Sequence, residues 1–251
     1  MLRHIFRNLW NTRKRNGWIM LELIVIAVVC WMVVDPLFVI YYNRSIPDGY
    51  ESEGLYRLQL STVPSKEQGK QADFFQLLER LRSHAQIESA TYLVNGNYPC
   101  ARGNSFNNLS RDTMSVRVAF MYFVPHTDFF KTWRIRSVKD GTWETLENTT
   151  YLSNDIVLTS DAADCLSPGK DLTGGEVYAG SNTAVRVAAV AQPVKMKNCM
   201  QPFYLRFIAW QDTVPHWVLE SGTTLFARTR PGVSESRFIE EFIPWMEEHL
   251  V

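Results

Sequence analysis

Apolar residues run almost without interruption from position 18 to position 41, in the stretch WIMLELIVIAVVCWMVVDPLFVIY. Its only charged side chains are Glu22 and Asp35. A helix of this length reaches roughly 36 Å, enough to cross a hydrocarbon layer of ~30 Å. Because backbone polar groups find no water inside a bilayer, a single span must be helical. The pattern therefore predicts one transmembrane helix over residues 17–42.

Beyond this stretch, the apolar positions are spaced as in a folded domain. Residues 55–60 and 87–94 have the pattern of β-strands. Between them, residues 70–85 predict an amphipathic helix, because five apolar residues recur at helical spacing. These residues are Phe74, Leu77, Leu78, Leu81 and Ala85. We expect this strand–helix–strand order to form an α/β layer with the helix on one face of a sheet.

Shorter elements follow. Residues 95–111 are rich in Asn, Gly and Ser and predict a loop, whereas residues 114–124 give the clearest strand pattern in the chain. Residues 128–133 predict one helical turn. The other predicted strands span residues 155–159, 184–190, 203–210 and 223–229. A last helix starts near Ser234, and Pro244 should kink or interrupt it.

This order predicts an α+β fold, with a single N-terminal transmembrane helix followed by a two-lobed periplasmic domain. The first lobe, an α/β layer, is split between residues 50–125 and 201–251. A mostly β lobe, residues 126–200, is inserted into it. We expect residues 55–124 and 203–249 to pack together despite their separation. The final strand and helix lack a following strand, which is typical of a module that continues further.

Charge differs between the two sides of the span. Residues 1–16 carry five basic residues and no acidic one, and removing these five from 26 leaves 21 basic against 26 acidic residues, a net charge of −5. Short basic flanks stay cytoplasmic, so we expect the N-terminus inside and the large domain outside. A cleaved signal peptide fits less well, because the apolar run is long and no A-x-A site follows it.

Residues 1–16 also predict a cytoplasmic amphipathic helix on the bilayer surface. Five apolar side chains fall at helical spacing there, namely Leu2, Ile5, Phe6, Leu9 and Trp10. The basic run at residues 13–15 is short and adjacent to lipid, which argues for attraction to anionic lipid and against nucleic-acid binding.

Candidate chemistry is sparse, and we expect no catalytic, cofactor-binding or metal-binding residues and no enzymatic activity. Gly169 and Lys170 resemble the end of a phosphate-binding loop, but Asp164 and Asp171 stand where glycine and Ser/Thr would be needed. His126 and Asp128 are more simply a surface histidine and a helix-capping aspartate than a metal site. Trp133, Trp143, Trp210, Trp217 and Trp245 could line a ligand site, although core packing is the commoner use.

Two acidic residues in the span have structural explanations. Glu22 lies about one turn inside the basic edge, and we favour a packing or inward-facing role over a proton relay. Asp35, with Pro36, marks either a kink or the end of the membrane helix rather than a transport site.

The cysteines allow at most one disulfide outside the membrane. Cys100, Cys165 and Cys199 follow the span, and an odd number leaves one thiol unpaired. Cys100 and Cys199 both flank the proposed inserted lobe, so a bond between them is a hypothesis that requires Cα atoms within about 7 Å. No cysteine or histidine cluster has zinc spacing.

Several stretches together resemble the permease subunits of ABC transporters of the MacB/FtsX type, with their MacB-like periplasmic core domain. The opening MLRHIFRNLWNTRKRNGW is similar to the basic start of these permeases, and residues 55–58 are similar to their first periplasmic strand. Residues 129–135, 155–159, 167–172 and 185–190 resemble the inserted lobe in order. Residues 225–232 resemble the return to the first lobe. Family members have four or more transmembrane helices, so this resemblance implies further helices after position 251.

The resemblance implies a bacterial inner-membrane protein that couples ATP hydrolysis by a partner ATPase in the cytoplasm to periplasmic conformational change or export. The implied partners are that ATPase, a second permease copy, the lipid bilayer and a periplasmic protein. The resemblance assigns no catalytic lysine to this chain, because residues 168–170 are explained as a tight turn exposed to solvent. The alternative is a single-pass periplasmic receptor that binds a ligand or partner without an ATPase.

Overall fold

The computed structural model describes residues 13–59, 74–93, 97–99, 101, 105–180, 183–197, 204–210 and 224–249. The chain divides into two units, residues 1–46 and residues 47–251, and each is described by itself. The predicted amphipathic helix over residues 1–16 lies almost wholly outside the described residues.

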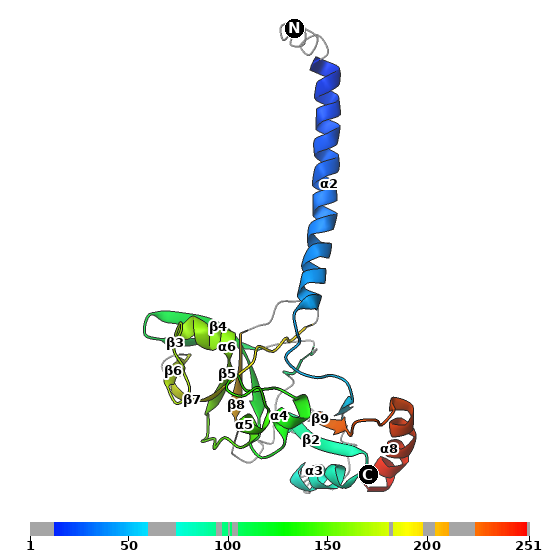
Figure 1. Ribbon diagram of the computed structural model, residues 1–251, viewed down its shortest axis with the longest axis vertical. Coiled ribbons are helices and arrows are strands. Elements are labelled where there is room, and N and C mark those ends of the chain that lie inside the picture. The colour runs from blue at the N-terminus through cyan, green and yellow to red at the C-terminus, as the bar shows by residue number, and fades with distance from the viewer. Residues whose placement is uncertain are drawn as a thin grey trace, which may run out of the picture. The chain divides into compact units, whose positions relative to one another are not determined.

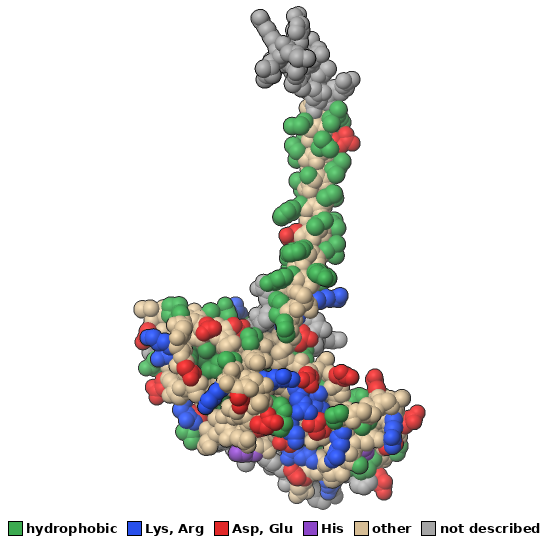
Figure 2. All heavy atoms as spheres, viewed as in Figure 1, with side chains coloured by type: hydrophobic (Ala, Val, Ile, Leu, Met, Phe, Trp, Pro, Cys, Tyr) green, Lys and Arg blue, Asp and Glu red, His purple; other side chains and the backbone are tan. Residues whose placement is uncertain are grey.

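The first unit is one helix, α2 (Arg13–Ser45). Its segment Gly17–Ser45 is the one described helix that is long and apolar enough to cross a membrane. Apolar side chains line the face seen in Figure 2, and those of residues 17–42 are exposed, as expected where lipid is the solvent. The helix continues through Pro36 to Ser45, so the alternative in which Pro36 ends it is wrong.

A three-stranded sheet with two helices begins and ends the second unit (Figure 1). The strand order is β1 (Leu55–Gln59), β9 (Thr224–Thr229), β2 (Ile87–Leu93), and β9 is antiparallel to both neighbours. The helices α3 (Phe74–Ser83) and α8 (Glu235–His249) share one buried cluster with Leu225 and Ala227 of β9. We call this part the sheet lobe. The predicted packing of the first and last parts of the domain is confirmed for these elements.

The other strands form a closed barrel in the order β3-β4-β8-β5-β7-β6. The described strands are β3 (Phe106–Arg111), β4 (Met114–Phe123), β5 (Ile156–Thr159), β6 (Glu176–Ala179), β7 (Thr183–Ala191) and β8 (Leu205–Ala209). Leu109, Val118, Ile156, Val177 and Val187 belong to its buried core, together with helix α6 (Ser160–Leu166).

The barrel corrects the predicted lobe boundaries. Residues 106–123 and 205–209 were expected in the first lobe, but β4 pairs in parallel with β8, and β8 pairs with β5. The far half of β4 is apolar on both faces because one face, with Met121 and Phe123, joins the cluster around α4, and the other, with Val118, joins the barrel core.

The predicted loop over residues 95–111 is also wrong at its end, where β3 forms a hairpin with β4. The turn joins Arg111 to its partner Met114, and Asp112 has φ 51°. Such a turn favours Asn, Asp or Gly. Polar side chains fall on both faces of β3, with Asn107 and Arg111 on the face of the buried Leu109, and this hides the strand pattern.

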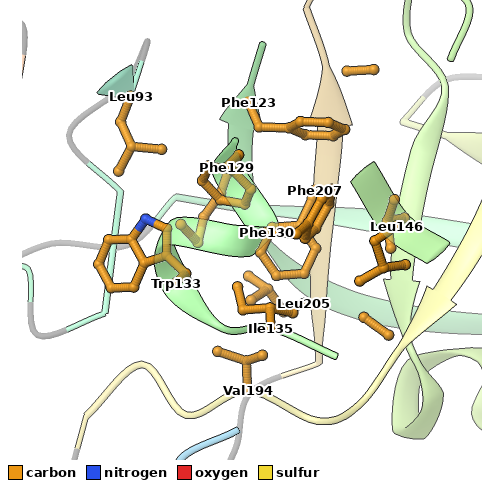
Figure 3. Close-up of a cluster of buried hydrophobic side chains, with 14 of the residues drawn as sticks. Leu93, Phe123, Phe129, Phe130, Trp133, Ile135, Leu146, Val194, Leu205 and Phe207 are labelled. Atoms are coloured by element: carbon orange, nitrogen blue, oxygen red, sulfur yellow. The ribbon is translucent and has the colours of Figure 1, made fainter. Parts of the chain in front are cut away.

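A third cluster of buried side chains lies around α4 (Phe129–Trp133), which confirms the predicted helical turn, and beside α5 (Glu144–Glu147). Phe129 and Phe130 are fully buried and contact Phe123 of β4 and Phe207 of β8 (Figure 3). Trp133 lies against Phe226 of β9, with ring centroids 4.7 Å apart. Helix α4 therefore lies between the barrel and the sheet and contributes to both.

Candidate functional site

Residues 47–54, here called the leading segment, precede β1 and are fixed to the domain at several points. The Lys195 backbone N–H donates to the Asp48 carbonyl at 2.8 Å, and the Lys195 ammonium lies 3.2 Å from the Asp48 carboxylate. Lys195 is only 1 % exposed. Gly49 has φ +75°, and a Cβ there would lie 1.9 Å from the Pro193 carbonyl oxygen. Only glycine therefore fits at this point.

The next residues attach to the end of α4. The Glu51 backbone N–H donates to the Trp133 carbonyl at 3.2 Å. Tyr50 packs edge-on against the Trp133 ring, with centroids 5.7 Å apart. On the surface, Arg136 forms an ion pair with the Glu51 carboxylate at 2.9 Å. These contacts hold the leading segment to the barrel side of the domain.

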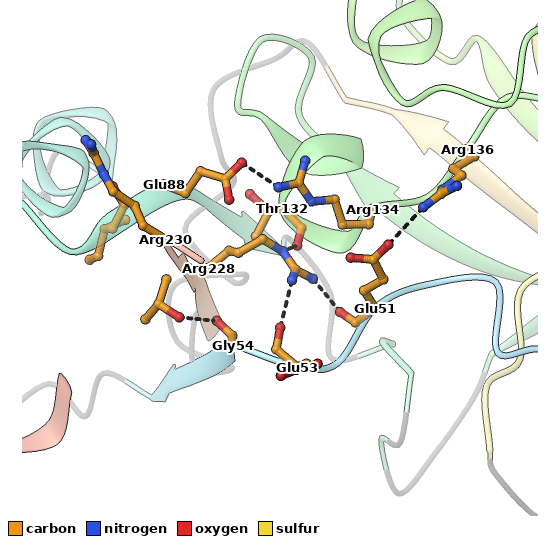
Figure 4. Close-up of polar contacts among 11 residues, drawn as sticks. Glu51, Glu53, Gly54, Glu88, Thr132, Arg134, Arg136, Arg228 and Arg230 are labelled. Atoms are coloured by element: carbon orange, nitrogen blue, oxygen red, sulfur yellow. Dashed lines mark hydrogen bonds and ion pairs between the residues drawn. The ribbon is translucent and has the colours of Figure 1, made fainter. Parts of the chain in front are cut away.

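Arg228 of β9 ties the leading segment and α4 to the sheet (Figure 4). Its Nε donates to the Thr132 carbonyl at 2.6 Å, and its Nη1 donates to the Glu53 carbonyl at 2.8 Å. Its Nη2 donates to the Glu51 carbonyl. One guanidinium thus binds two segments, the leading segment and α4, that are distant in sequence from each other and from its own strand. We call this arrangement the joint: Arg228 with the carbonyls of Glu51, Glu53 and Thr132, and the Glu51–Trp133 hydrogen bond.

The position of Arg228 follows from strand geometry. Side chains of β9 alternate, so Leu225 and Ala227 join the cluster under α3 and α8, whereas Phe226 joins the cluster around α4. Arg228 shares the Phe226 face and is 4 % exposed. Burial, and then repulsion from Arg134, lower the pKa of its guanidinium, while Glu51 and Glu88 act in the opposite direction. Three carbonyl acceptors compensate for part of the desolvation.

A polar cleft of about 720 Å³ opens beside the joint, between the leading segment and the start of α8. Arg134 forms an ion pair with Glu88 at 2.5 Å in its wall. The charged residues that line the cleft are Glu51, Glu53, Glu88, Arg134, Arg228, Arg230 and Glu235. Acidic and basic side chains are both present, so the lining residues can form ion pairs with one another and polar contacts with a partner. The described part of the chain has no group of three or more His, Cys, Asp or Glu placed to bind a metal.

The sequence candidates lie elsewhere. His126 is exposed and has φ 67°. Asp128 has φ 52° and makes no side-chain cap to α4, so the capping prediction is wrong; its carboxylate pairs with Arg82 at 3.2 Å instead. Lys170 is exposed at the turn after Pro168, as the sequence predicts. The candidates are not brought together into one site.

The tryptophans divide between the core and its margin. Trp133 is buried in the core, and Trp143 lies under the cations of Lys131 and Arg134. Trp210 and Trp245 pack at the edge of the sheet-lobe cluster. Trp217, and both cysteines of the hypothetical disulfide, Cys100 and Cys199, lie outside the described residues. Cys165 is a half-buried free thiol, and Glu22 and Asp35 are exposed on α2.

Sequence reasoning missed Arg228 and the leading segment. One signal was present: Arg228 interrupts an apolar strand that begins Leu225-Phe226-Ala227. A cation in such a strand must find acceptors if both faces of the strand are buried.

No protein-family profile matches the sequence, and no curated protein matches it. Among solved structures, the periplasmic region of MacB from Actinobacillus actinomycetemcomitans is similar, with a TM-score of 0.47 and 11 % identity over 80 % of this chain and 86 % of that one. The extracellular domain of the noncanonic ABC-type transporter YknZ from Gram-positive bacteria has a TM-score of 0.40 and 8 % identity, over 66 % and 75 %. A domain of a putative permease from Porphyromonas gingivalis has a TM-score of 0.40 and 16 % identity, over 65 % and 71 %.

Proposed function

We propose that this chain is the N-terminal part of a permease subunit of an ABC transporter of the MacB/FtsX type, and that the joint passes movement of helix α2 to the folded domain. The observation that carries this proposal is the attachment of the leading segment. It starts at residue 47, directly after α2 ends at Ser45. It is bound within eight residues to Lys195 on the barrel side and to Arg228 on the sheet side.

This attachment suits the transfer of force. A flexible linker would absorb a displacement of the helix, whereas hydrogen bonds and buried contacts pass it on. Because Arg228 binds the leading segment and α4, and α4 contacts both lobes, a pull on the leading segment acts on the barrel and the sheet together. In this mechanism ATP is hydrolysed by a separate ATPase in the cytoplasm, the basic N-terminus lies near it, and the folded domain lies in the periplasm of a bacterial inner-membrane protein. A second permease copy completes the assembly.

Photo-crosslinking tests the ATPase partner. A photoreactive amino acid replaces Trp10, in the segment closest to the cytoplasmic surface, and the control probe replaces Asn108, exposed on β3. In native membranes we expect the probe at Trp10 to capture a protein that mass spectrometry identifies as an ABC ATPase, and the probe at Asn108 to capture none. Capture of no ATPase at Trp10 contradicts the proposal.

Distance measurements test the joint. Spin labels at Asn108 and at Ser236, both exposed, report on the barrel and the sheet lobe. In the purified complex with the captured ATPase, ATP with vanadate should shift the distance distribution. Arg228→Ala should reduce that shift and leave the rate of ATP hydrolysis, measured without vanadate, unchanged. An equal shift in the variant means that the joint does not pass the movement.

The receptor alternative draws on the polar cleft, which offers charged groups of both signs to a ligand or protein partner. It predicts that no ATPase is captured and that removal of ATP leaves the behaviour of the domain unchanged. The crosslinking result therefore separates the two functions.

A further inference from the structure

Glu147 holds the end of α4 that lies opposite the joint. It is the last residue of α5, and its Oε1 accepts a hydrogen bond from the Lys131 backbone N–H at 3.1 Å. A carboxylate at a helix N-terminus normally comes from the residue before the helix. Here Asp128 makes no side-chain cap, and Glu147 occupies that place from a distance of 16 residues along the chain.

The other end of α4 belongs to the joint. Thr132 and Trp133 provide the carbonyls that accept from Arg228 and from the Glu51 N–H. Since α4 has only five residues, its two ends are about one turn apart. A shift of the first turn, where Glu147 binds, therefore reaches the carbonyls that hold the leading segment.

Four groups of the packed elements face Glu147. Asp128, before α4, repels its charge, and Arg82 of α3 attracts it. Lys131 donates through its backbone and places its ammonium over the Trp143 ring. Tyr151 donates its hydroxyl to the Leu146 carbonyl at 2.6 Å. Its own pKa is raised by burial and by the charge of Glu147.

Burial outweighs these hydrogen bonds and raises the pKa of Glu147 from 4.5 to about 7. The folded state therefore holds a proton that the open state would release. The bound proton stabilises the folded state, fully below about pH 4.5, and this stabilisation is lost as the pH rises through about 7. Ionised Glu147 consequently favours movement of its side chain toward water.

We propose that Glu147 is a pH-sensitive switch beneath α4 that controls how firmly the joint is held. When Glu147 is protonated, α5 and α4 stay together and the joint is tight; when it ionises, the contact between the two helices opens more often and the joint loosens. This inference rests on the proposed function of the joint. It gives the permease a response to the pH outside the membrane, where the folded domain would lie.

Hydrogen exchange of the full chain in lipid nanodiscs tests the switch. From pH 6 to pH 8, after correction for intrinsic exchange, opening of residues 128–134 should increase about tenfold, the value that linkage gives for a pKa that moves from 4.5 to about 7. Residues 49–55 should follow with the same midpoint. Glu147→Gln, which removes the charge and keeps the shape, should make both peptides independent of pH.

Glu144→Gln is the matched control, since Glu144 is exposed on the same helix, and it should behave as the wild type. Equal pH profiles for the wild type and Glu147→Gln overturn the switch. A pH response in residues 128–134 without one in residues 49–55 overturns its link to the joint. No ATPase is needed for this experiment, so its result and that of the crosslinking are independent.

Discussion

The barrel and the sheet lobe differ in how many strand edges they leave without a partner. All six barrel strands have two neighbours, because β6 returns to β3. In the sheet lobe, the described residues give two neighbours only to β9. A sheet of three strands needs packing on its faces to be stable. Helices α3 and α8 cover one face, and α4 with the joint covers the other. The sheet lobe therefore depends on contacts outside itself, whereas in the barrel every strand is paired on both sides.

The largest expected effect tests whether the two lobes share one core. Phe130→Ala removes a fully buried ring that contacts Phe123 and Phe207, and it should destabilise the domain by about 3–5 kcal/mol. Urea unfolding of the full chain in detergent, followed by tryptophan fluorescence, measures the change. Phe106→Ala removes a ring that is 37 % exposed and should cost under about 1 kcal/mol. If the two variants lose the same free energy of unfolding, the cluster around α4 is not a core that the two lobes share.

The variant with the next largest expected effect should loosen the sheet lobe more than the barrel. Arg228→Ala removes the donor from one buried carbonyl, that of Thr132, and from two partly buried ones, and it should cost about 2–3 kcal/mol. Hydrogen exchange should increase in β1 and β9 more than in β5 and β7.

The control for Arg228 is another arginine attached to Glu51. Arg136 binds the Glu51 carboxylate at the surface, where both side chains are 50 % exposed. Arg136→Ala should cost less than about 1 kcal/mol, because exposed ion pairs contribute little. If the two variants lose the same stability, burial does not explain the strength of the joint.

The smallest effect concerns the leading segment alone. Gly49→Ala places a methyl group against the Pro193 carbonyl and should cost about 1–3 kcal/mol, with faster exchange confined to residues 47–54. Gly141→Ala is matched to it, because Gly141 has φ +72° with nothing within 4 Å of the added Cβ. That variant should show only the backbone penalty, about 1 kcal/mol. Faster exchange throughout the barrel of Gly49→Ala would show that the barrel also depends on the leading segment.

Elements with a regular apolar pattern were predictable from the sequence. The membrane helix and β4 are recognised from runs of apolar residues, whereas β1, α3, β2 and α8 show a strand or helix period over several residues, and local pattern specifies them all. Strand β3 was missed because polar residues fall on both of its faces. The lobe boundary was misplaced because β4 looks the same in sequence whether its partner is β8 or β2. Pairing between distant strands has no local signal.

The joint was less predictable still. Arg228 binds backbone carbonyls, which every residue has, so no partner side chain marks the site in the sequence. Likewise, Asp128 sits where a capping residue belongs, but its left-handed backbone directs it to Arg82, and Glu147 takes over the role. Both cases depend on how separate elements meet, which is decided by the tertiary fold.

The antiparallel pairing of β1 with β9 also determines when the protein can fold during synthesis. Arg228 lies 177 residues after Glu51, so β1 leaves the ribosome long before its partner strand exists. Barrel strand β4 likewise waits for β8. Contacts so distant in sequence make folding slow. The strand that follows the membrane helix in sequence therefore stays unpaired while the remainder of the domain is synthesised, and this is the period in which a chaperone would have to protect it.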